Sequence, residues 1–229
     1  MKKLNFIIKY GLALLLLSFY SCESWLNVTP SDRLSEEMLF NDREGFVKAL
    51  NGVYIELNTN ELYGRNLTAG ALDVMGQYYS VASSSHAFYN YGGLVYTGND
   101  EKALFDNMWQ KCYAVIACCN TIIEKCDENK AGLSPVWKGA IKGEALALRA
   151  MLHFDMLRLF SASPAIDKER KAIPYLESYT NLPQHQLTVG AVLEKVVKDL
   201  NAARELMREV DPYGPNYAKL ESLYRNHPL

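Results

Sequence analysis

The stretch GEALALRAMLHFDMLRLF, residues 143–160, decides the fold class of this chain. Together with Trp137 and Ile141 before it, its large apolar residues recur every three or four positions, which is the spacing of an α-helix. Further apolar residues widen this stripe to nearly every side, and such a helix is buried among other helices. Gly139 and Gly143 are small enough to let a neighbouring helix approach closely. The stretch therefore predicts a central helix in a mainly α-helical protein.

Amphipathic stretches on both sides predict the partners of this helix. Residues 105–126 and residues 189–207 each carry an apolar stripe, and Thr188 is expected to cap the second. A helix is predicted over residues 42–58, where Asn41 and Glu44 are spaced as in a capping box, after a single turn at residues 35–38. Strand patterns of comparable strength do not occur. We predict a mainly α fold of antiparallel helix pairs, a divergent tetratricopeptide-like helical repeat.

The first 21 residues have the features of an export signal. Lys2, Lys3 and Lys9 precede or flank an apolar core at residues 12–17, which is shorter than the about 20 residues that a transmembrane helix needs. Cys22 follows a small residue, so residues 1–21 are predicted to be a lipoprotein signal peptide and Cys22 the lipidated residue. A single-pass signal anchor in which Cys22 has no role is the alternative. Residues 22–34 are predicted to be a tether, and residues 35–229 the helical domain.

Charge and cysteine content exclude several classes of function. Removal of the signal peptide takes away three lysines and no acid, so the net charge falls from −2 to −5 and no basic stripe remains for nucleic acid. Cys112, Cys119 and Cys126 recur every seven residues, about 10 Å apart on a helix, which is too far for a disulfide. With Cys118 they are predicted to be reduced, buried thiols. Zinc-binding spacings are lacking, and we expect no metal and no cofactor.

Helical periodicity disappears between Asn60 and Asp100, a stretch rich in Gly, Ser and Tyr. A connection this long without regular structure tends to be functional. Sugar rings pack their C–H faces on aromatic rings while their hydroxyls need polar partners, and the segment supplies both. The candidate ligand-binding residues are Tyr78, Tyr79, Phe88, Tyr89, Asn90 and Tyr91. The alternative is that the tyrosines fill the base of a long loop.

Four ionisable residues, Glu144, Arg149, His153 and Asp155, lie close together in the sequence. Arg149 and His153 can share a helix face, but Glu144 and Asp155 cannot both join them there. We interpret Glu144 and Arg149 as pairing with a neighbouring helix, because buried charges are tolerated only when paired. Catalysis is the less favoured alternative. No nucleophile elbow, phosphate-binding loop, dinucleotide fingerprint or HExxH motif occurs, and we expect no enzymatic activity.

Several segments together resemble the SusD/RagB family. Trp109, Tyr113, Ile116, Asn120 and Ile123 match its W-x3-Y-x2-I-x3-N-x2-I pattern. The sequence GEALALRA and the following HFDMLRLF are very close to its G-E-A-x-A-L-R-A and F-D-L signature. Cys22 with the following Trp-Leu at 25–26, and the LNGVY sequence at 50–54, also fall in the family's order. The residues taken as the structural signature are Trp109, Tyr113, Asn120, Glu144, Arg149, Phe154 and Asp155.

The resemblance implies a surface-exposed lipoprotein, lipid-anchored at the outer membrane, that binds nutrients, most often oligosaccharides and in some members peptides. It also implies docking to a SusC-like TonB-dependent transporter through tetratricopeptide-like helices and delivery of the nutrient to it. Family members are longer, so we expect this chain to be the N-terminal portion of such a protein, without the C-terminal part. A helical-repeat scaffold that binds only protein partners is the alternative.

Overall fold

The computed structural model describes residues 36–208 and residue 210. Regular structure in this part of the chain is helical, apart from an isolated antiparallel bridge between Lys171 and Thr188. The predicted signal peptide (residues 1–21), the lipidation site Cys22 and the tether (residues 22–34) lie outside the described residues. Among the helices that are described, none combines the length and the apolar character needed to cross a membrane.

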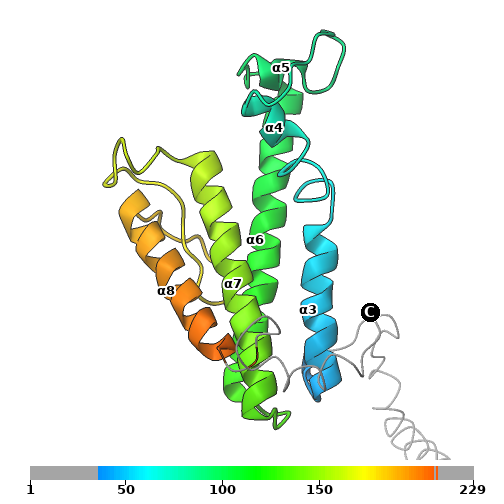
Figure 1. Ribbon diagram of the computed structural model, residues 1–229, viewed down its shortest axis with the longest axis vertical. Helices are drawn as coiled ribbons and strands as arrows, with labels where there is room; N and C mark the ends of the chain where they lie inside the picture. Colours follow the sequence, from blue (N-terminus) through cyan, green and yellow to red (C-terminus); the bar gives the residue numbers. More distant parts are fainter. Residues whose placement is uncertain (1–35, 209, 211–229) are drawn as a thin grey trace, which may run out of the picture. The chain divides into compact units, whose positions relative to one another are not determined.

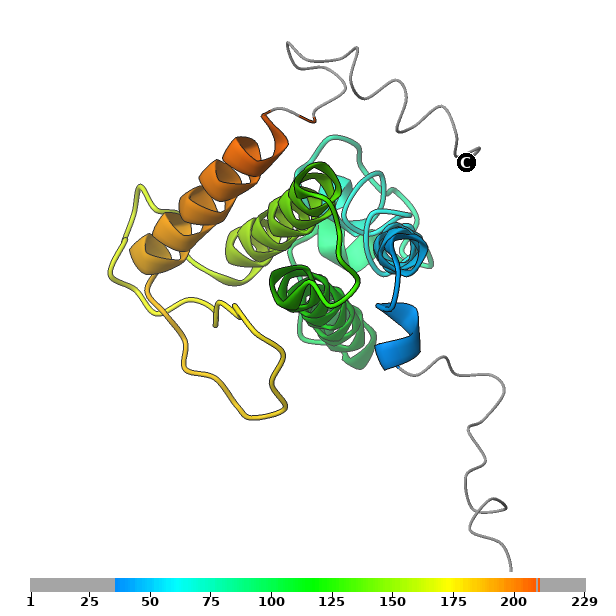
Figure 2. The same ribbon diagram turned by 90° about the horizontal axis from the view of Figure 1, so that it is seen from below.

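Four long helices alternate in direction along the chain (Figure 1). α3 (Arg43–Leu57) and α6 (Asn99–Glu128) run in opposite directions, α7 (Pro135–Phe160) returns along α6, and α8 (Val189–Met207) runs back along α7. Figure 2 shows α7 between α6 and α8, and α3 contacts both α6 and α7. The predicted mainly α fold of antiparallel helix pairs is therefore confirmed.

Side chains at the helix starts explain where three of the long helices begin. Asp42 Oδ1 accepts a hydrogen bond from the Gly45 amide at 2.8 Å and caps α3. The predicted capping box that begins at Asn41 is therefore wrong by one residue. Ser134 caps α7 in the same way, and Thr188 caps α8 as predicted, with its hydroxyl 3.2 Å from the Ala191 amide. Each cap satisfies an amide that the helix itself cannot pair.

The core lies where α3, α6 and α7 meet, and α8 closes the other side of α7. The buried stripe of α6 consists of apolar residues at helical spacing: Met108, Cys112, Val115, Ile116, Cys119, Ile122, Ile123 and Cys126. α7 is buried on several sides, as predicted. Gly139 and Gly143 face α8, because a Cβ atom at Gly139 would lie 2.8 Å from the Leu206 carbonyl oxygen. The small residues thus allow α7 and α8 to pack closely.

The cysteines of α6 divide between its two faces. Cys112, Cys119 and Cys126 are free and buried, and burial raises the pKa of the Cys119 and Cys126 thiols to about 12. The prediction of reduced, buried thiols is confirmed for these three residues. It is wrong for Cys118, which is free but exposed. Cys118 is one position off the apolar stripe, and a step of about 100° around the helix turns it away from the core.

The Tyr-rich segment is less irregular than its sequence predicts. It contains two short helices, α4 (Ala71–Met75) and α5 (Tyr89–Gly92), joined by turns. A further single turn, α2 (Glu36–Leu39), precedes α3 and agrees with the turn predicted at residues 35–38. The expectation of a segment without regular structure is therefore wrong over α4 and α5. Both helices are too short to carry an apolar period that could be recognised in the sequence.

Candidate functional site

Tyr91 holds the Tyr-rich segment together. Its side chain is only 2% exposed and packs against Phe88, Tyr96 and Phe105, with ring centroids 5.9, 6.4 and 6.0 Å away. Burial, followed by the nearby carboxylates of Glu101 and Asp100, raises the pKa of the Tyr91 hydroxyl to about 12. A buried ring cannot offer its face to a ligand. Tyr91 is therefore a packing residue, and its inclusion among the ligand contacts is corrected.

The side-chain amide of Asn90 uses its nitrogen for a hydrogen bond within the protein and leaves its oxygen available. Its Nδ2 donates a hydrogen bond to Glu101 Oε1 at 2.7 Å. Glu101 is buried in the first turn of α6, where a carboxylate also interacts favourably with the helix dipole. The Asn90 side chain as a whole is exposed. Its amide oxygen can therefore accept a hydrogen bond from a ligand hydroxyl while its nitrogen fixes the orientation of the group.

The three remaining tyrosines expose their rings. Tyr78 is 83% exposed, and Tyr79 and Tyr89 are both 42% exposed. The Tyr79 hydroxyl faces the backbone carbonyls of Ala69 and Gly70, 3.2 Å from the latter, so the ring is held while its face stays open. Gln77, which has a positive φ of 60°, donates from Nε2 to the Gly92 carbonyl at 2.9 Å and ties this turn to α5.

We name the exposed set, with the partly buried Phe88, the aromatic cap: Tyr78, Tyr79, Phe88, Tyr89 and Asn90. It combines aromatic faces with one oriented amide on a backbone that is pinned at several points. Residues of these types can bind a molecule that has both flat apolar faces and hydroxyl groups.

A continuous series of ring contacts leads from the aromatic cap into the helical core. Phe105 packs on Phe160 with centroids 6.2 Å apart, and Phe160 packs on Trp109 at 4.9 Å. Trp109 contacts Tyr113 at 4.7 Å, and Tyr113 contacts His153 at 5.9 Å. The signature residues Trp109 and Tyr113 are thus partly buried residues that pack against the core and join α6 to α7.

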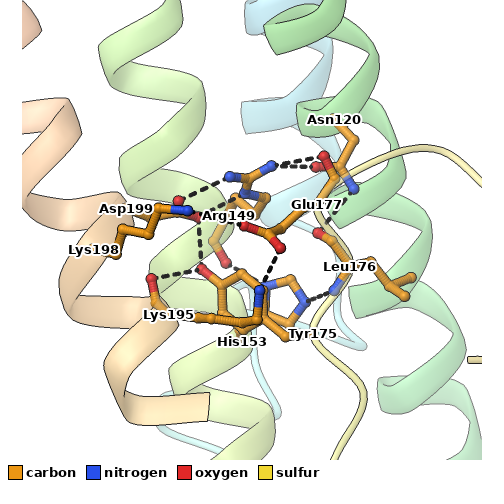
Figure 3. Close-up of polar contacts among 9 residues, drawn as sticks. All are labelled: Asn120, Arg149, His153, Tyr175, Leu176, Glu177, Lys195, Lys198 and Asp199. Atoms are coloured by element: carbon orange, nitrogen blue, oxygen red, sulfur yellow. Dashed lines mark hydrogen bonds and ion pairs between the residues drawn. The ribbon is translucent and has the colours of Figure 1, made fainter. Parts of the chain in front are cut away.

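A buried polar network that includes His153, the last ring of this series, joins α6, α7 and α8 (Figure 3). Arg149 of α7 forms two hydrogen bonds with Asp199 of α8, at 2.7 Å from Nε and 2.9 Å from Nη2, and both side chains are buried. Arg149 Nη1 also donates to Asn120 Oδ1 of α6 at 2.8 Å. The Asn120 amide nitrogen donates to the Leu176 carbonyl at 3.0 Å. Arg149 therefore pairs with a neighbouring helix, as the sequence analysis proposed.

His153 is a fixed, neutral member of this network. Its Nε2 accepts a hydrogen bond from the Leu176 amide at 3.0 Å, and its Nδ1 lies 2.9 Å from the Arg149 carbonyl oxygen, which can only accept. The proton is therefore on Nδ1. Burial lowers the pKa of His153 to about 4, and its ring stacks on Tyr175 at 3.8 Å. A fully buried imidazole with both nitrogens engaged is unsuited to acid–base catalysis on a ligand.

The other signature residues make contacts between segments. Glu144 accepts a hydrogen bond from the Tyr54 hydroxyl of α3, and its partner helix is therefore a different one from that of Arg149. Asp155 accepts from the Tyr63 hydroxyl at 2.5 Å and pairs with Arg158 at 3.0 Å. Phe154, in contrast, is exposed. Within residues 36–208, no group of three or more His, Cys, Asp or Glu side chains is placed to hold a metal ion.

Comparison with known proteins gives a consistent result. The SusD-like family described as "Starch-binding associating with outer membrane" matches residues 24–215. SusD-like protein P2 of Formosa agariphila is 25% identical over 208 residues, which are 89% of this chain and 37% of that protein. The chain thus spans less than half the length of this curated relative.

Solved structures share the fold. A putative sugar binding protein from Bacteroides vulgatus is 24% identical, with a TM-score of 0.59 over 72% of this chain and 37% of that one. A SusD superfamily protein from Bacteroides thetaiotaomicron is 22% identical, with a TM-score of 0.58 over 81% of this chain and 42% of that one. At these identities the likeness concerns the arrangement of the helices.

Proposed function

We propose that this chain binds oligosaccharides through its aromatic cap and delivers them to a SusC-like TonB-dependent transporter. The chain belongs to the SusD-like family, whose proteins are described as starch-binding and associating with the outer membrane. The resemblance to the SusD/RagB family is confirmed at the level of the family. The family description is one of binding and not of catalysis, which agrees with the expectation of a non-enzymatic protein.

The exposed rings of the aromatic cap carry the proposal for the ligand. Tyr78, Tyr79 and Tyr89 leave their faces open although each lies on a segment that hydrogen bonds or ring packing hold in place. Aromatic rings that are exposed on a fixed backbone can stack against a ligand without first having to order a loop. Stacking of pyranose rings would cover this surface, and Asn90 would bind a hydroxyl.

Binding of maltohexaose to the purified full chain, measured by isothermal titration calorimetry, tests the site. We expect Tyr78→Ala and Tyr89→Ala each to weaken binding by about tenfold, since a lost aromatic contact is worth roughly 1 kcal/mol or more. Tyr179→Ala is the matched control, because Tyr179 is 66% exposed but lies outside the cap. Unchanged affinity in both cap variants would refute the site. Tyr91 is unsuitable as a test residue because its loss would unpack the segment.

The location at the outer membrane is proposed to depend on lipid attached to Cys22. Growth of cells with radioactive palmitate should label the wild-type chain, and Cys22→Ala should abolish both the label and recovery of the protein in the outer-membrane fraction. A wild-type chain without label, or a label that survives Cys22→Ala, would refute lipidation at Cys22. An unlabelled wild-type chain that stays in the membrane would favour the signal-anchor alternative. Protease treatment of intact cells then tests whether the anchored chain faces the outside.

Docking to the transporter is proposed to use the helical face formed by residues 101–210. Val197 and Leu200 of α8 are large apolar residues that lie exposed on this part of the chain. Leu200→Lys should weaken co-purification with a co-expressed SusC-like transporter, and Lys198→Ala is a control on the same helix. Val197 and Leu200 equally favour the second candidate, a scaffold that binds only protein. Retained co-purification in a chain that binds none of the glycans tested would support the scaffold.

A further inference from the structure

A hollow of about 370 Å³ lies at the carboxyl end of α7, apart from the aromatic cap. Phe154, Leu157 and Arg158 line it from the helix, and residues 161–164 complete its wall. None of these residues belongs to the cap. The volume lies within the range of about 300–1,000 Å³ that small-molecule sites occupy. The hollow is thus large enough for a small ligand and has no role in the ligand binding described above.

The lining residues offer an aromatic surface beside hydrogen-bonding groups. Phe154 is 39% exposed, and the Arg158 guanidinium lies 5.7 Å from its ring centroid. Arg158 uses Nη1 to bind Asp155 at 3.0 Å, which leaves its other N–H groups without a partner among the described residues. The Ser163 hydroxyl accepts from the Ala165 amide at 3.3 Å and keeps its own proton to donate. The hollow can therefore donate several hydrogen bonds next to an apolar ring.

The local charge favours a neutral ligand. Asp155, which the Tyr63 hydroxyl also holds in place, compensates the charge of Arg158. The hollow lies at the carboxyl end of α7, where the helix dipole places partial negative charge. Both features oppose an anion. A neutral molecule with adjacent hydroxyl groups would meet the donors of Arg158 without this penalty.

We propose that the hollow is a second saccharide subsite that takes one neutral pyranose ring of an oligosaccharide. The C–H face of the ring packs on Phe154, two neighbouring hydroxyl oxygens accept hydrogen bonds from Arg158, and a third accepts from Ser163. This subsite rests on the proposed sugar-binding function, but it uses none of the residues of the aromatic cap.

Methyl NMR of the full chain labelled with 13C at the alanine methyl groups tests the subsite and the cap separately. Ala162 lines the hollow, and Ala87 precedes Phe88 of the cap, so the two methyl signals report on the two sites. The probes are four neutral hexasaccharides, maltohexaose, cellohexaose, xylohexaose and mannohexaose, with hexagalacturonate as the acidic arm. At least one neutral hexasaccharide should shift the Ala162 signal in a saturable manner, and hexagalacturonate should shift it less.

Variants then assign the shift to the named side chains. Phe154→Ala and Arg158→Met should each weaken the response of Ala162 by about tenfold. Tyr78→Ala should leave it unchanged, and so should the control Tyr179→Ala. Because Phe154 also contributes packing, circular dichroism of Phe154→Ala checks its folding. If that variant does not fold, Arg158→Met, which changes an exposed side chain, decides the question.

Three outcomes would overturn the subsite. The first is an Ala162 signal that no neutral hexasaccharide shifts; if the Ala87 signal does shift, the proposed function of the cap survives. The second is a stronger Ala162 response to hexagalacturonate than to any neutral probe. The third is a response that is the same in wild type and in Arg158→Met. A response at Ala162 without one at Ala87 would support the subsite and refute the cap.

Discussion

Replacement of Asp199 by Asn should destabilise this chain more than any other single polar substitution in α8. The carboxylate is buried and bonds Arg149 at 2.7 and 2.9 Å, and it also accepts from the Tyr175 hydroxyl at 2.6 Å. Asn keeps the shape but removes the charge, so the buried guanidinium loses its counter-ion. Breaking a buried pair in this way costs about 3–5 kcal/mol. For a domain of this size that corresponds to a fall in Tm of roughly 6–20 °C.

The double replacement Arg149→Met with Asp199→Leu separates the strength of the pair from the penalty of breaking it. Apolar side chains of similar volume need no counter-ion, and such exchanges are often close to neutral. Asn120 keeps its bond to the Leu176 carbonyl, and the Tyr175 hydroxyl keeps the Lys195 carbonyl within 3.5 Å. We therefore expect the double variant to be more stable than Asp199→Asn.

Urea denaturation of the full chain, followed by circular dichroism at 222 nm, measures both differences. Glu205→Gln is the control on α8, because Glu205 is exposed and its ion pairs should contribute under about 0.5 kcal/mol. The reasoning fails if Asp199→Asn lies within about 1 kcal/mol of wild type, since the pair would then be hydrated. It also fails if the double variant is less stable than Asp199→Asn.

Three further substitutions or conditions have defined outcomes. Stability should be highest above pH 6.5 and fall by about 3 kcal/mol as the pH drops to about 4, because unfolded His153 takes up a proton that the folded state excludes until its lowered pKa of about 4 is reached; denaturation at several pH values should show a steeper slope in wild type than in His153→Gln. Gly139→Ala should lower the free energy of unfolding by about 1–3 kcal/mol, because the new methyl would lie 2.8 Å from a backbone oxygen of α8. Gly52→Ala, whose methyl would have no atom within 4 Å, should stabilise α3 by up to about 1 kcal/mol. Thermal unfolding that shows the same sign for both variants would contradict the packing. In a Cys22→Ala background, Cys118 should react with Ellman's reagent in the native chain, while the three buried thiols should react only after unfolding. A native count above one thiol would show that the core opens.

The sequence predicts the long helices well because each carries apolar residues at helical spacing. The main error in their bounds is the start of α6, which lies six residues before Phe105. The first turns of α6 are polar, and its N-cap is Gly98, which has no side chain to cap the helix. Neither the apolar period nor the capping pattern could therefore mark this start. The burial of Glu101 against Asn90 explains how these polar turns are held.

The sequence predicts that Arg149 of the polar network is paired, but it does not identify the partner. Arg149 lies in an apolar stretch, which predicts that it needs a partner, but the partner is 50 residues away on α8. A clue exists in α8 itself: its buried positions are Val189, Val192, Val196, Asp199 and Ala203, so the one acid occupies a core position. The contacts of residues 175–177 have no such clue, because that segment has no period and is placed by tertiary contacts alone.

The same limit applies to the aromatic cap. Composition alone identified the Tyr-rich segment, but it could not separate the buried Tyr91 from the exposed Tyr89 two residues earlier. Tyr91 is distinguished by its contacts with Phe105 of α6, which no local pattern encodes. A candidate site drawn from composition therefore mixes residues that support the surface with residues that form it.

α6 explains how the proposed binding surface near its amino end could be prepared before a ligand arrives. It has 30 residues and is about 45 Å long, with Glu101 and Phe105 under the aromatic cap and Asn120 in the polar network. The cap backbone is fixed to this helix by the Asn90–Glu101 bond and by the packing of Tyr91. Binding would then have to order only the exposed side chains, at about 0.5–1.5 kcal/mol each, and not a loop. A pinned segment with open rings is for this reason better suited to holding a flexible oligosaccharide than a mobile loop of the same composition.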